Sequence, residues 1–142
     1  MLQVKLFTLY PDLFPGLLDV GIYKKARENK KWSLEVINIR DYAFDSNRTV
    51  DDTPFGGGSG MLLKPDVVAA AIDKNVTPKD KIIYLSPKGK KLDQHTIKSF
   101  SKLKNINILC GHFEGVDQRR LETRFFFDDT TTTEIYSLAL RA

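Results

Sequence analysis

The sequence has one cysteine and two histidines, and this scarcity excludes several kinds of site. With Cys110 alone, no disulfide can form within the chain, and its apolar neighbours favour a buried thiol in a reduced compartment. No His, Cys, Asp and Glu residues have the spacing of metal ligands, and Cys110 lacks the context of a nucleophile. His95 is expected on an exposed helix without a role. His112 lies in a suspected ligand loop, where a lone histidine is more often a bystander than a base.

Long apolar runs are also missing. No segment approaches the length that spans a membrane, and the first ten residues alternate charged and apolar side chains unlike a signal peptide. We therefore expect a cytoplasmic protein of one domain. The net charge of +4 and the pI near 9.1 weakly favour an anionic binding partner. Basic residues form two clusters, of which the first also fits the solvated face of a helix: Lys24, Lys25, Arg27, Lys30, Lys31, and then Lys88, Lys90, Lys91.

Short apolar runs alternate with helical periodicity along the first 110 residues. Strands are predicted at residues 4–9, 33–39, 81–85 and 106–110. Helices are predicted after Pro11, from Pro65 and after a capping Asp93. The first of these helices is predicted from the three- and four-residue spacing of Leu13, Leu17, Leu18, Ile22 and Ala26. This order predicts an α/β fold with a mainly parallel sheet flanked by helices.

A glycine-rich stretch, VDDTPFGGGSGM at residues 50–61, lies within an irregular segment of roughly 25 residues. Four of five consecutive positions are glycine, so the backbone can approach a ligand closely. A flexible surface loop explains the glycines alone about equally well. The stretch is not a phosphate loop, because no Gly-Lys-Ser/Thr follows and the spacing is not GxGxxG.

Two further glycine-containing loops directly follow apolar strands. SPKGK follows residues 81–85, and GHFEGVDQR follows residues 106–110. Ligands of parallel α/β sheets bind beyond the carboxyl ends of the strands, so these loops predict a small-ligand site. Glu114 is a candidate partner there for a cation or a hydroxyl group. The alternative is a pair of tight strand-to-helix turns, with Asp117 as a helix cap.

The three motifs, in this order, resemble those of the bacterial tRNA (guanine-N1)-methyltransferases, members of the SPOUT superfamily of knotted methyltransferases. The segments VKLFTLYPDLF and VINIRDYAFD are similar to the opening strand, helix and second strand of that family. The resemblance covers residues 1 to about 120. It implies a trefoil-knot fold, a homodimer, and transfer of a methyl group from S-adenosylmethionine to the guanosine 3′ of the anticodon of a tRNA.

The resemblance also implies site residues. The cofactor would be bound by two loops, matched by Tyr84, Leu85, Ser86, Pro87 and Gly89 in the first and Gly111, Glu114 and Gly115 in the second. The target guanine would lie near Pro54, Phe55, Gly56, Gly57 and Gly58. Guanine N1 carries a proton at neutral pH, so the reaction needs a general base, which the sequence does not identify.

Beyond residue 120 the sequence departs from the family pattern. The third knot loop is replaced by a divergent tail at residues 121–142, with runs of phenylalanine and threonine, and we expect the family's C-terminal tRNA-binding domain to be absent. Asp128 and Asp129 lie in no matching motif. We therefore expect an incomplete knot, uncovered apolar faces and doubtful turnover. The alternatives are a non-catalytic remnant or RNA-binding fragment of the enzyme and, with least support, an unrelated small-ligand domain.

Overall fold

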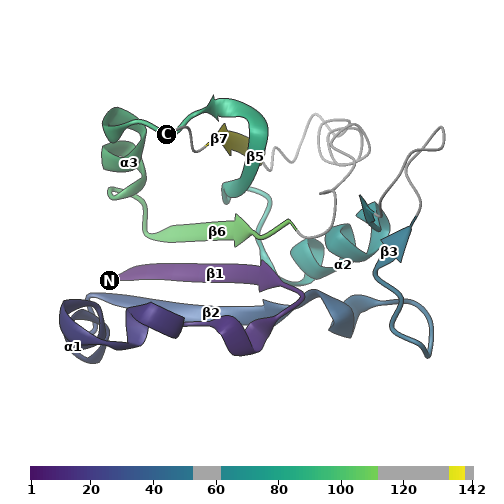
Figure 1. Cartoon of the computed structure of the whole chain (residues 1–142). Coiled ribbons are helices and arrows are strands. Elements are labelled where there is room, and N and C mark those ends of the chain that lie inside the picture. The colour runs from purple at the N-terminus through teal and green to yellow at the C-terminus, as the bar shows by residue number, and fades with distance from the viewer. Residues whose placement is uncertain (53–61, 112–134, 140–142) are drawn as a thin grey trace.

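The computed structural model of the chain describes residues 1–52, 62–111 and 135–139. Its main element is a sheet of five parallel strands in the order β2-β1-β6-β5-β7 (Figure 1). The strands are β1 (Leu2–Thr8), β2 (Trp32–Asn38), β5 (Ile82–Lys91), β6 (Asn105–Leu109) and β7 (Ile135–Ala139). Helices flank this sheet, so the predicted α/β class with a mainly parallel sheet is confirmed.

The helices lie on opposite faces of the sheet because of the strand order. The steps from β1 to β2 and from β5 to β6 run in one direction across the sheet, and the step from β2 to β5 runs in the other. Right-handed crossovers therefore place α1 (Gly21–Glu28) and α3 (Gln94–Phe100) on one face and α2 (Pro65–Asn75) on the other. Between α1 and α3, no described helix covers the middle of β1 and β6 (Figure 1).

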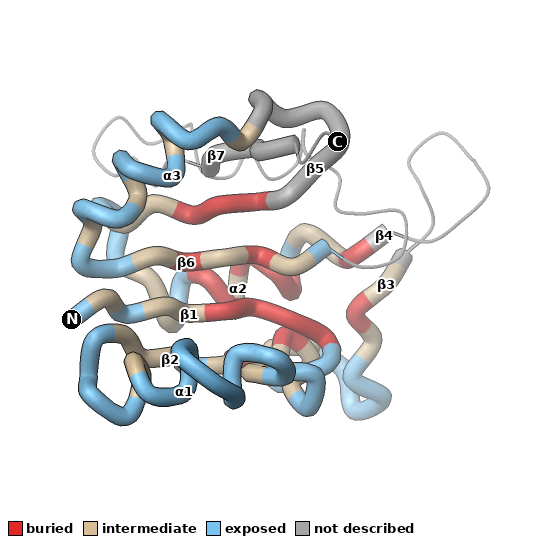
Figure 2. The backbone as a smooth tube through the Cα atoms, turned by 60° about the vertical axis from the view of Figure 1, so that its left-hand side comes forward, coloured by how far each residue is buried: buried red, intermediate tan, exposed pale blue. Residues whose placement is uncertain are grey.

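The hydrophobic core lies between the sheet and α2. Ile37, Phe7, Leu109 and Tyr84 occupy one row across four neighbouring strands, and all four side chains are buried. The same core includes residues from α2, which is buried along one side (Figure 2): Val67, Val68, Ala69, Ala71, Ile72. Burying a large aliphatic or aromatic side chain contributes about 1.5–3 kcal/mol, so this row fixes the sheet register.

The predicted first helix is wrong in its extent. Two short 3-10 helices, Pro11–Leu13 and Gly16–Asp19, precede α1. Gly16 and Gly21 have φ angles of 55° and 59°, which the interior of a right-handed helix does not contain, so each begins a new helical segment, and Pro15 has no N–H to donate. The leucines that suggested a core-facing helix point outward instead; Leu17, for example, is 87% exposed.

The other two helices are confirmed close to their predicted starts. Pro65 occupies the first turn of α2, where its missing N–H costs nothing. Asp93 caps α3, and its carboxylate accepts a hydrogen bond of 2.8 Å from the backbone N–H of Thr96. This bond lowers the pKa of Asp93 below its ordinary value.

The segment predicted to be irregular contains more structure than expected. It begins within a 3-10 helix at Ile39–Tyr42, and later two short strands, β3 (Asp51–Asp52) and β4 (Leu62–Leu63), pair antiparallel. Between the 3-10 helix and β3, Asp45 accepts hydrogen bonds from the N–H and hydroxyl groups of Thr49, which lower the pKa of Asp45. Residues 112–134, which would include the knot, lie outside the described ranges, so the knot stays a prediction.

Candidate functional site

Two of the predicted cofactor residues meet at the carboxyl edge of the sheet. Tyr84 on β5 is level with Leu109 on β6, and Gly111 follows β6 by two residues. A Cβ atom built on Gly111 would lie 2.9 Å from Cε2 and 3.0 Å from the hydroxyl oxygen of Tyr84. The Tyr84 ring is 7% exposed, so it has little room to withdraw. Position 111 therefore has room only for glycine, because the Tyr84 ring packs where a Cβ atom would lie.

The first predicted cofactor loop is part of a strand, which corrects the expected end of that strand at residue 85. β5 continues to Lys91, but its pairing with β7 is interrupted, because Leu85 and Lys90 are both opposite Leu138. The four residues between them are left out of the regular ladder. Pro87 explains part of this, since proline cannot donate to a ladder hydrogen bond. Ser86, Pro87 and Gly89 thus lie where regular pairing breaks.

The glycine-rich stretch begins and ends at a hairpin base that is fixed to the core. Asp51 pairs with Leu63, and the N–H of Lys64 donates a 2.7 Å hydrogen bond to the carbonyl of Val50. Val50 and Leu63 are 1% and 0% exposed. This base lies beyond the carboxyl ends of β1 and β6 (Figure 1). The predicted guanine-loop residues Pro54, Phe55, Gly56, Gly57 and Gly58 lie outside the described residues, as do Glu114 and Gly115.

The end of β1 contributes a buried polar group that the sequence analysis did not single out. Thr8 is 0% exposed, and its hydroxyl oxygen accepts a 3.1 Å hydrogen bond from the N–H of Tyr10. This bond turns the chain out of the sheet at the edge where Gly111 leaves β6. A threonine at the end of an apolar run, directly before Leu-Tyr-Pro, is the signal that would have identified it.

Cys110 lies beside this turn, and its environment argues against nucleophilic chemistry. Its N–H donates a 2.9 Å hydrogen bond to the carbonyl of Phe7, which holds the residue after β6 against β1. Burial raises the pKa of the Cys110 thiol above its ordinary value, so the thiol stays protonated at neutral pH. A protonated thiol is a poor nucleophile and a poor metal ligand.

Other possible site types were searched for within the described part of the chain. No three side chains of His, Cys, Asp or Glu come together there as metal ligands would. Within the same residues, no helix has the length and apolar character needed to cross a membrane. The strongest concentration of described site residues is the carboxyl edge, where Tyr84 approaches Gly111 and beyond which the paired β3 and β4 lie (Figure 1).

Comparison with known proteins gives consistent matches. Residues 2–133 match the family described as tRNA (guanine-1)-methyltransferase TrmD, so the match includes part of the segment that we separate as the tail. A tRNA (guanine-N(1)-)-methyltransferase of Pelagibacter ubique (strain HTCC1062) is 59% identical over 124 residues, which are 87% of this chain and 54% of the relative.

Two further relatives with the same name are more distant. The protein of Rhodospirillum rubrum is 45% identical over 123 residues, covering 87% of this chain and 52% of the relative. That of Wolbachia pipientis subsp. Culex pipiens (strain wPip) is 43% identical over 122 residues, covering 84% and 53%. The chain spans about half the length of the curated relatives it matches.

Proposed function

This chain belongs to the tRNA (guanine-1)-methyltransferase TrmD family, and on that premise we propose that it transfers a methyl group from S-adenosylmethionine to N1 of the guanosine 3′ of the anticodon of tRNA. The match over residues 2–133 carries this proposal and confirms the resemblance drawn from the motifs. The methyltransferase domain is proposed to be residues 1–120. Residues 121–142 are proposed to be a separate divergent tail, although the family match continues to residue 133.

The residues present fit the proposed cofactor. Gly111 is exposed, so its backbone is open to a ligand at the sheet edge where the Tyr84 ring packs. A nucleoside needs such a place, with an apolar wall and accessible backbone polar groups. Tyr84, Leu85, Ser86, Pro87 and Gly89, with Gly111, Glu114 and Gly115, would hold the cofactor. The bound cofactor supplies a methyl group already activated on a sulfonium.

The protein's own task is then alignment and proton removal. Holding two reactants in line can supply about 7–11 kcal/mol of the barrier without any covalent participation by the protein. The fixed hairpin base at Val50 and Leu63 supports a role for Pro54, Phe55, Gly56, Gly57 and Gly58 in placing the guanine at this edge. A carboxylate would suit the removal of the N1 proton, and no described residue is assigned that role.

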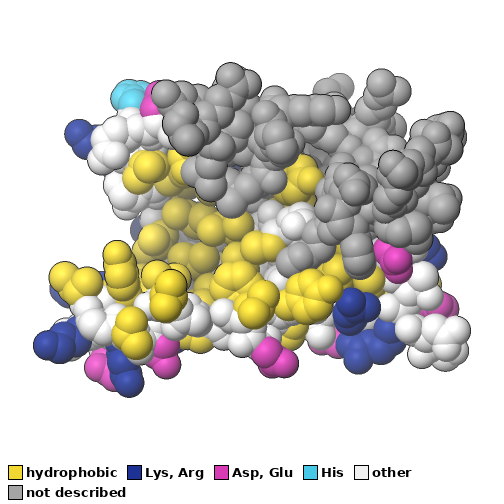
Figure 3. All heavy atoms as spheres, in the orientation of Figure 1, with side chains coloured by type: hydrophobic (Ala, Val, Ile, Leu, Met, Phe, Trp, Pro, Cys, Tyr) yellow, Lys and Arg dark blue, Asp and Glu magenta, His cyan; other side chains and the backbone are white. Residues whose placement is uncertain are grey.

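The homodimer is proposed from an apolar surface that no described element covers. Residues of the sheet face between α1 and α3 are only half-buried, as for Val4, Val36, Ile106 and Ile108. Figure 3 shows hydrophobic side chains gathered in a hollow over β1 and β6. Segment 13–23 adds strongly exposed apolar side chains beside it: Leu13, Leu17, Val20, Ile22, Tyr23. We propose that a second copy covers this surface, since monomers rarely expose so much contiguous apolar area.

A methylation assay tests the proposed function. The purified chain is incubated with S-adenosylmethionine labelled in the methyl group and a tRNA transcript carrying guanosine 3′ of the anticodon. We expect label in the RNA, recovered as N1-methylguanosine on digestion. A transcript with adenosine at that position is the matched control and should stay unlabelled.

The second candidate function is an RNA-binding fragment that does not turn over. It is favoured by one observation, that the chain spans about half the length of its curated relatives. Binding of the guanosine transcript without label transfer, even in a single turnover with excess protein, would establish it and reject the first proposal.

A further inference from the structure

Lysine side chains gather at the amino ends of the strands, on the edge opposite the candidate site. Lys79 lies in the loop before β5, and Lys102 and Lys104 lie between α3 and β6. Lys98 is in the last turn of α3. These four residues are named the lysine cluster here. None of them belongs to the two basic clusters recognised in the sequence, because they are separated along the chain.

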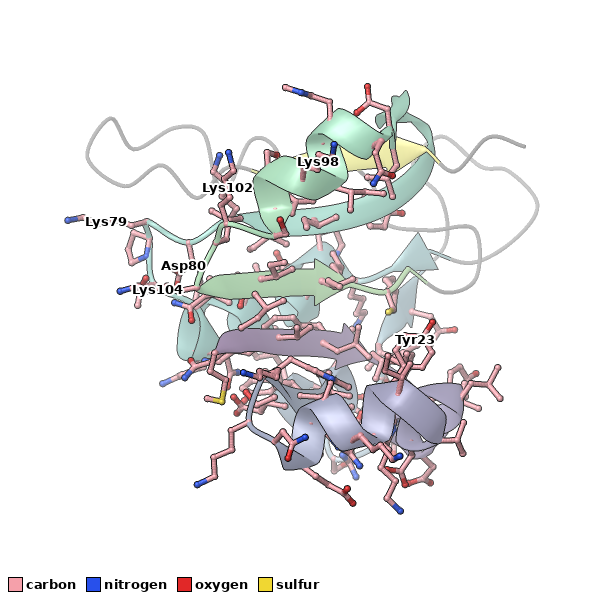
Figure 4. All side chains as sticks on the ribbon, turned by 90° about the vertical axis from the view of Figure 1, so that its left-hand side faces the viewer. Tyr23, Lys79, Asp80, Lys98, Lys102 and Lys104 are labelled. Carbon is pink, nitrogen blue, oxygen red and sulfur yellow. The ribbon has the colours of Figure 1, made fainter. Side chains whose placement is uncertain are left out.

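The fold brings these separated lysines together. β5 and β6 are neighbours in register from Ile82 and Asn107, and the Asn107 side chain donates a 3.0 Å hydrogen bond to the Lys81 carbonyl. The carbonyl of Lys104 accepts a 2.8 Å hydrogen bond from the N–H of Gln3 on β1. The entries to the two strands are therefore fixed side by side. In Figure 4, Lys79 and Lys104 project on the same side, with Lys102 and Lys98 above them.

The lysine cluster is exposed and keeps a net positive charge within the described residues. None of the four lysines forms an ion pair among those residues. Asp80 lies between Lys79 and Lys104 (Figure 4), where its carboxylate accepts a 2.7 Å hydrogen bond from the Thr77 hydroxyl and offsets one of the four positive charges. Compensation of a helix dipole explains a lysine in the last turn of α3. It does not explain Lys79, Lys102 and Lys104, which lie outside helices.

We propose that the lysine cluster contacts the phosphate backbone of the tRNA at a distance from the methylated base; this inference rests on the proposed function. β1 has seven residues. A strand of that length separates the amino edge from the carboxyl edge by about 20 Å. Lysine ammonium groups act on phosphates as point charges, so the contact carries no sequence information. The cluster thus strengthens binding of the whole tRNA without selecting the target base.

Binding measurements with the full chain test this proposal. The variant Lys79→Gln/Lys102→Gln/Lys104→Gln is compared with Lys24→Gln/Lys25→Gln/Lys30→Gln, which removes the same charge from exposed lysines in and after α1. Fluorescence anisotropy gives Kd for a whole tRNA transcript and for its isolated anticodon stem-loop across a salt series. For whole tRNA, the cluster variant should lower the slope of log Kd against log salt by about 2 to 3.

The controls separate this inference from the proposed function. The control variant should keep most of the wild-type slope, and both variants should bind the isolated stem-loop as wild type does. An unchanged slope in the cluster variant, or equal losses in the two variants, overturns the inference and leaves the methylation proposal standing. The inference is also overturned if the cluster variant binds tRNA as wild type does but loses binding to phosphatidylserine vesicles. A wild-type chain that binds no tRNA at low salt overturns both proposals.

Discussion

At the scale of single residues, the contact between Gly111 and Tyr84 joins two segments that are 27 positions apart in the sequence. Both residues were assigned to the cofactor site from their motifs. Their packing could not be predicted, because nothing in a glycine's neighbours says which ring will occupy the space of its missing Cβ. Thr8 shows the converse, since the sequence carries a local signal for its buried hydroxyl, a threonine that ends an apolar run directly before Leu-Tyr-Pro.

The variant Gly111→Ala is expected to destabilise the chain, because the new methyl group would overlap the buried Tyr84 ring. Overpacking of this kind costs about 1–3 kcal/mol. Urea unfolding followed by circular dichroism measures the change in the free energy of unfolding. In a Tyr84→Leu background the same alanine should cost clearly less, and equal costs in both backgrounds would contradict the packing argument.

A second residue-scale prediction concerns Asn107, which is 2% exposed and whose amide donates to the Lys81 carbonyl. Asn107→Ala leaves that carbonyl without this donor, and we expect a loss of about 1–3 kcal/mol in unfolding free energy. Asn105→Ala is the matched control, since Asn105 lies two residues earlier on the same strand and is exposed. Similar losses in the two variants would show that the buried hydrogen bond contributes nothing.

At the scale of elements, the parallel strands and the starts of α2 and α3 were predictable because their signals are local. Apolar runs gave the strands, and Pro65 and Asp93 marked helix starts. The helix predicted after Pro11 failed because periodicity does not report φ angles, and Gly16 and Gly21 interrupt it. The extension of β5 beyond residue 85 was not predicted, for a different reason. Its second half pairs with β7, a partner about 50 residues away in the sequence.

The cap of α3 gives a pH prediction. The hydrogen bond from Thr96 lowers the pKa of Asp93, so the stabilisation is present above the unfolded-state value of 3.8 and is lost as the pH falls through the lower folded-state pKa. Asp93→Asn keeps a hydrogen-bond acceptor but does not titrate. The melting midpoint of this variant should therefore depend less on pH in this acid range. Asp93→Ala should lower the midpoint at pH 7. An unchanged acid dependence in Asp93→Asn would exclude Asp93 as a source.

At the scale of the whole molecule, the proposed homodimer depends on the sheet face between α1 and α3, which no described element covers. Leu17 and Ile22 are 87% and 75% exposed beside it, so a second copy would bury them. Leu17→Glu/Ile22→Glu should shift the chain toward monomer in sedimentation equilibrium, because burying two carboxylates opposes the contact. Lys24→Gln/Lys25→Gln lowers the net charge by the same two units nearby, at exposed residues that are already polar. Equal effects of the two pairs would point to net charge alone.

The pairing of β5 with β7 links the candidate site to the tail. Leu85, which is a predicted cofactor residue, is level with Leu138, and β7 lies just beyond residue 133, where the family match ends. A ligand that favours the paired form of β5 must by thermodynamic reciprocity strengthen the attachment of β7, and β7 must strengthen binding of that ligand equally. If the proposed cofactor favours the paired form of β5, β7 acts as an effector carried on the same chain, and weakening its pairing would lower the affinity for that cofactor.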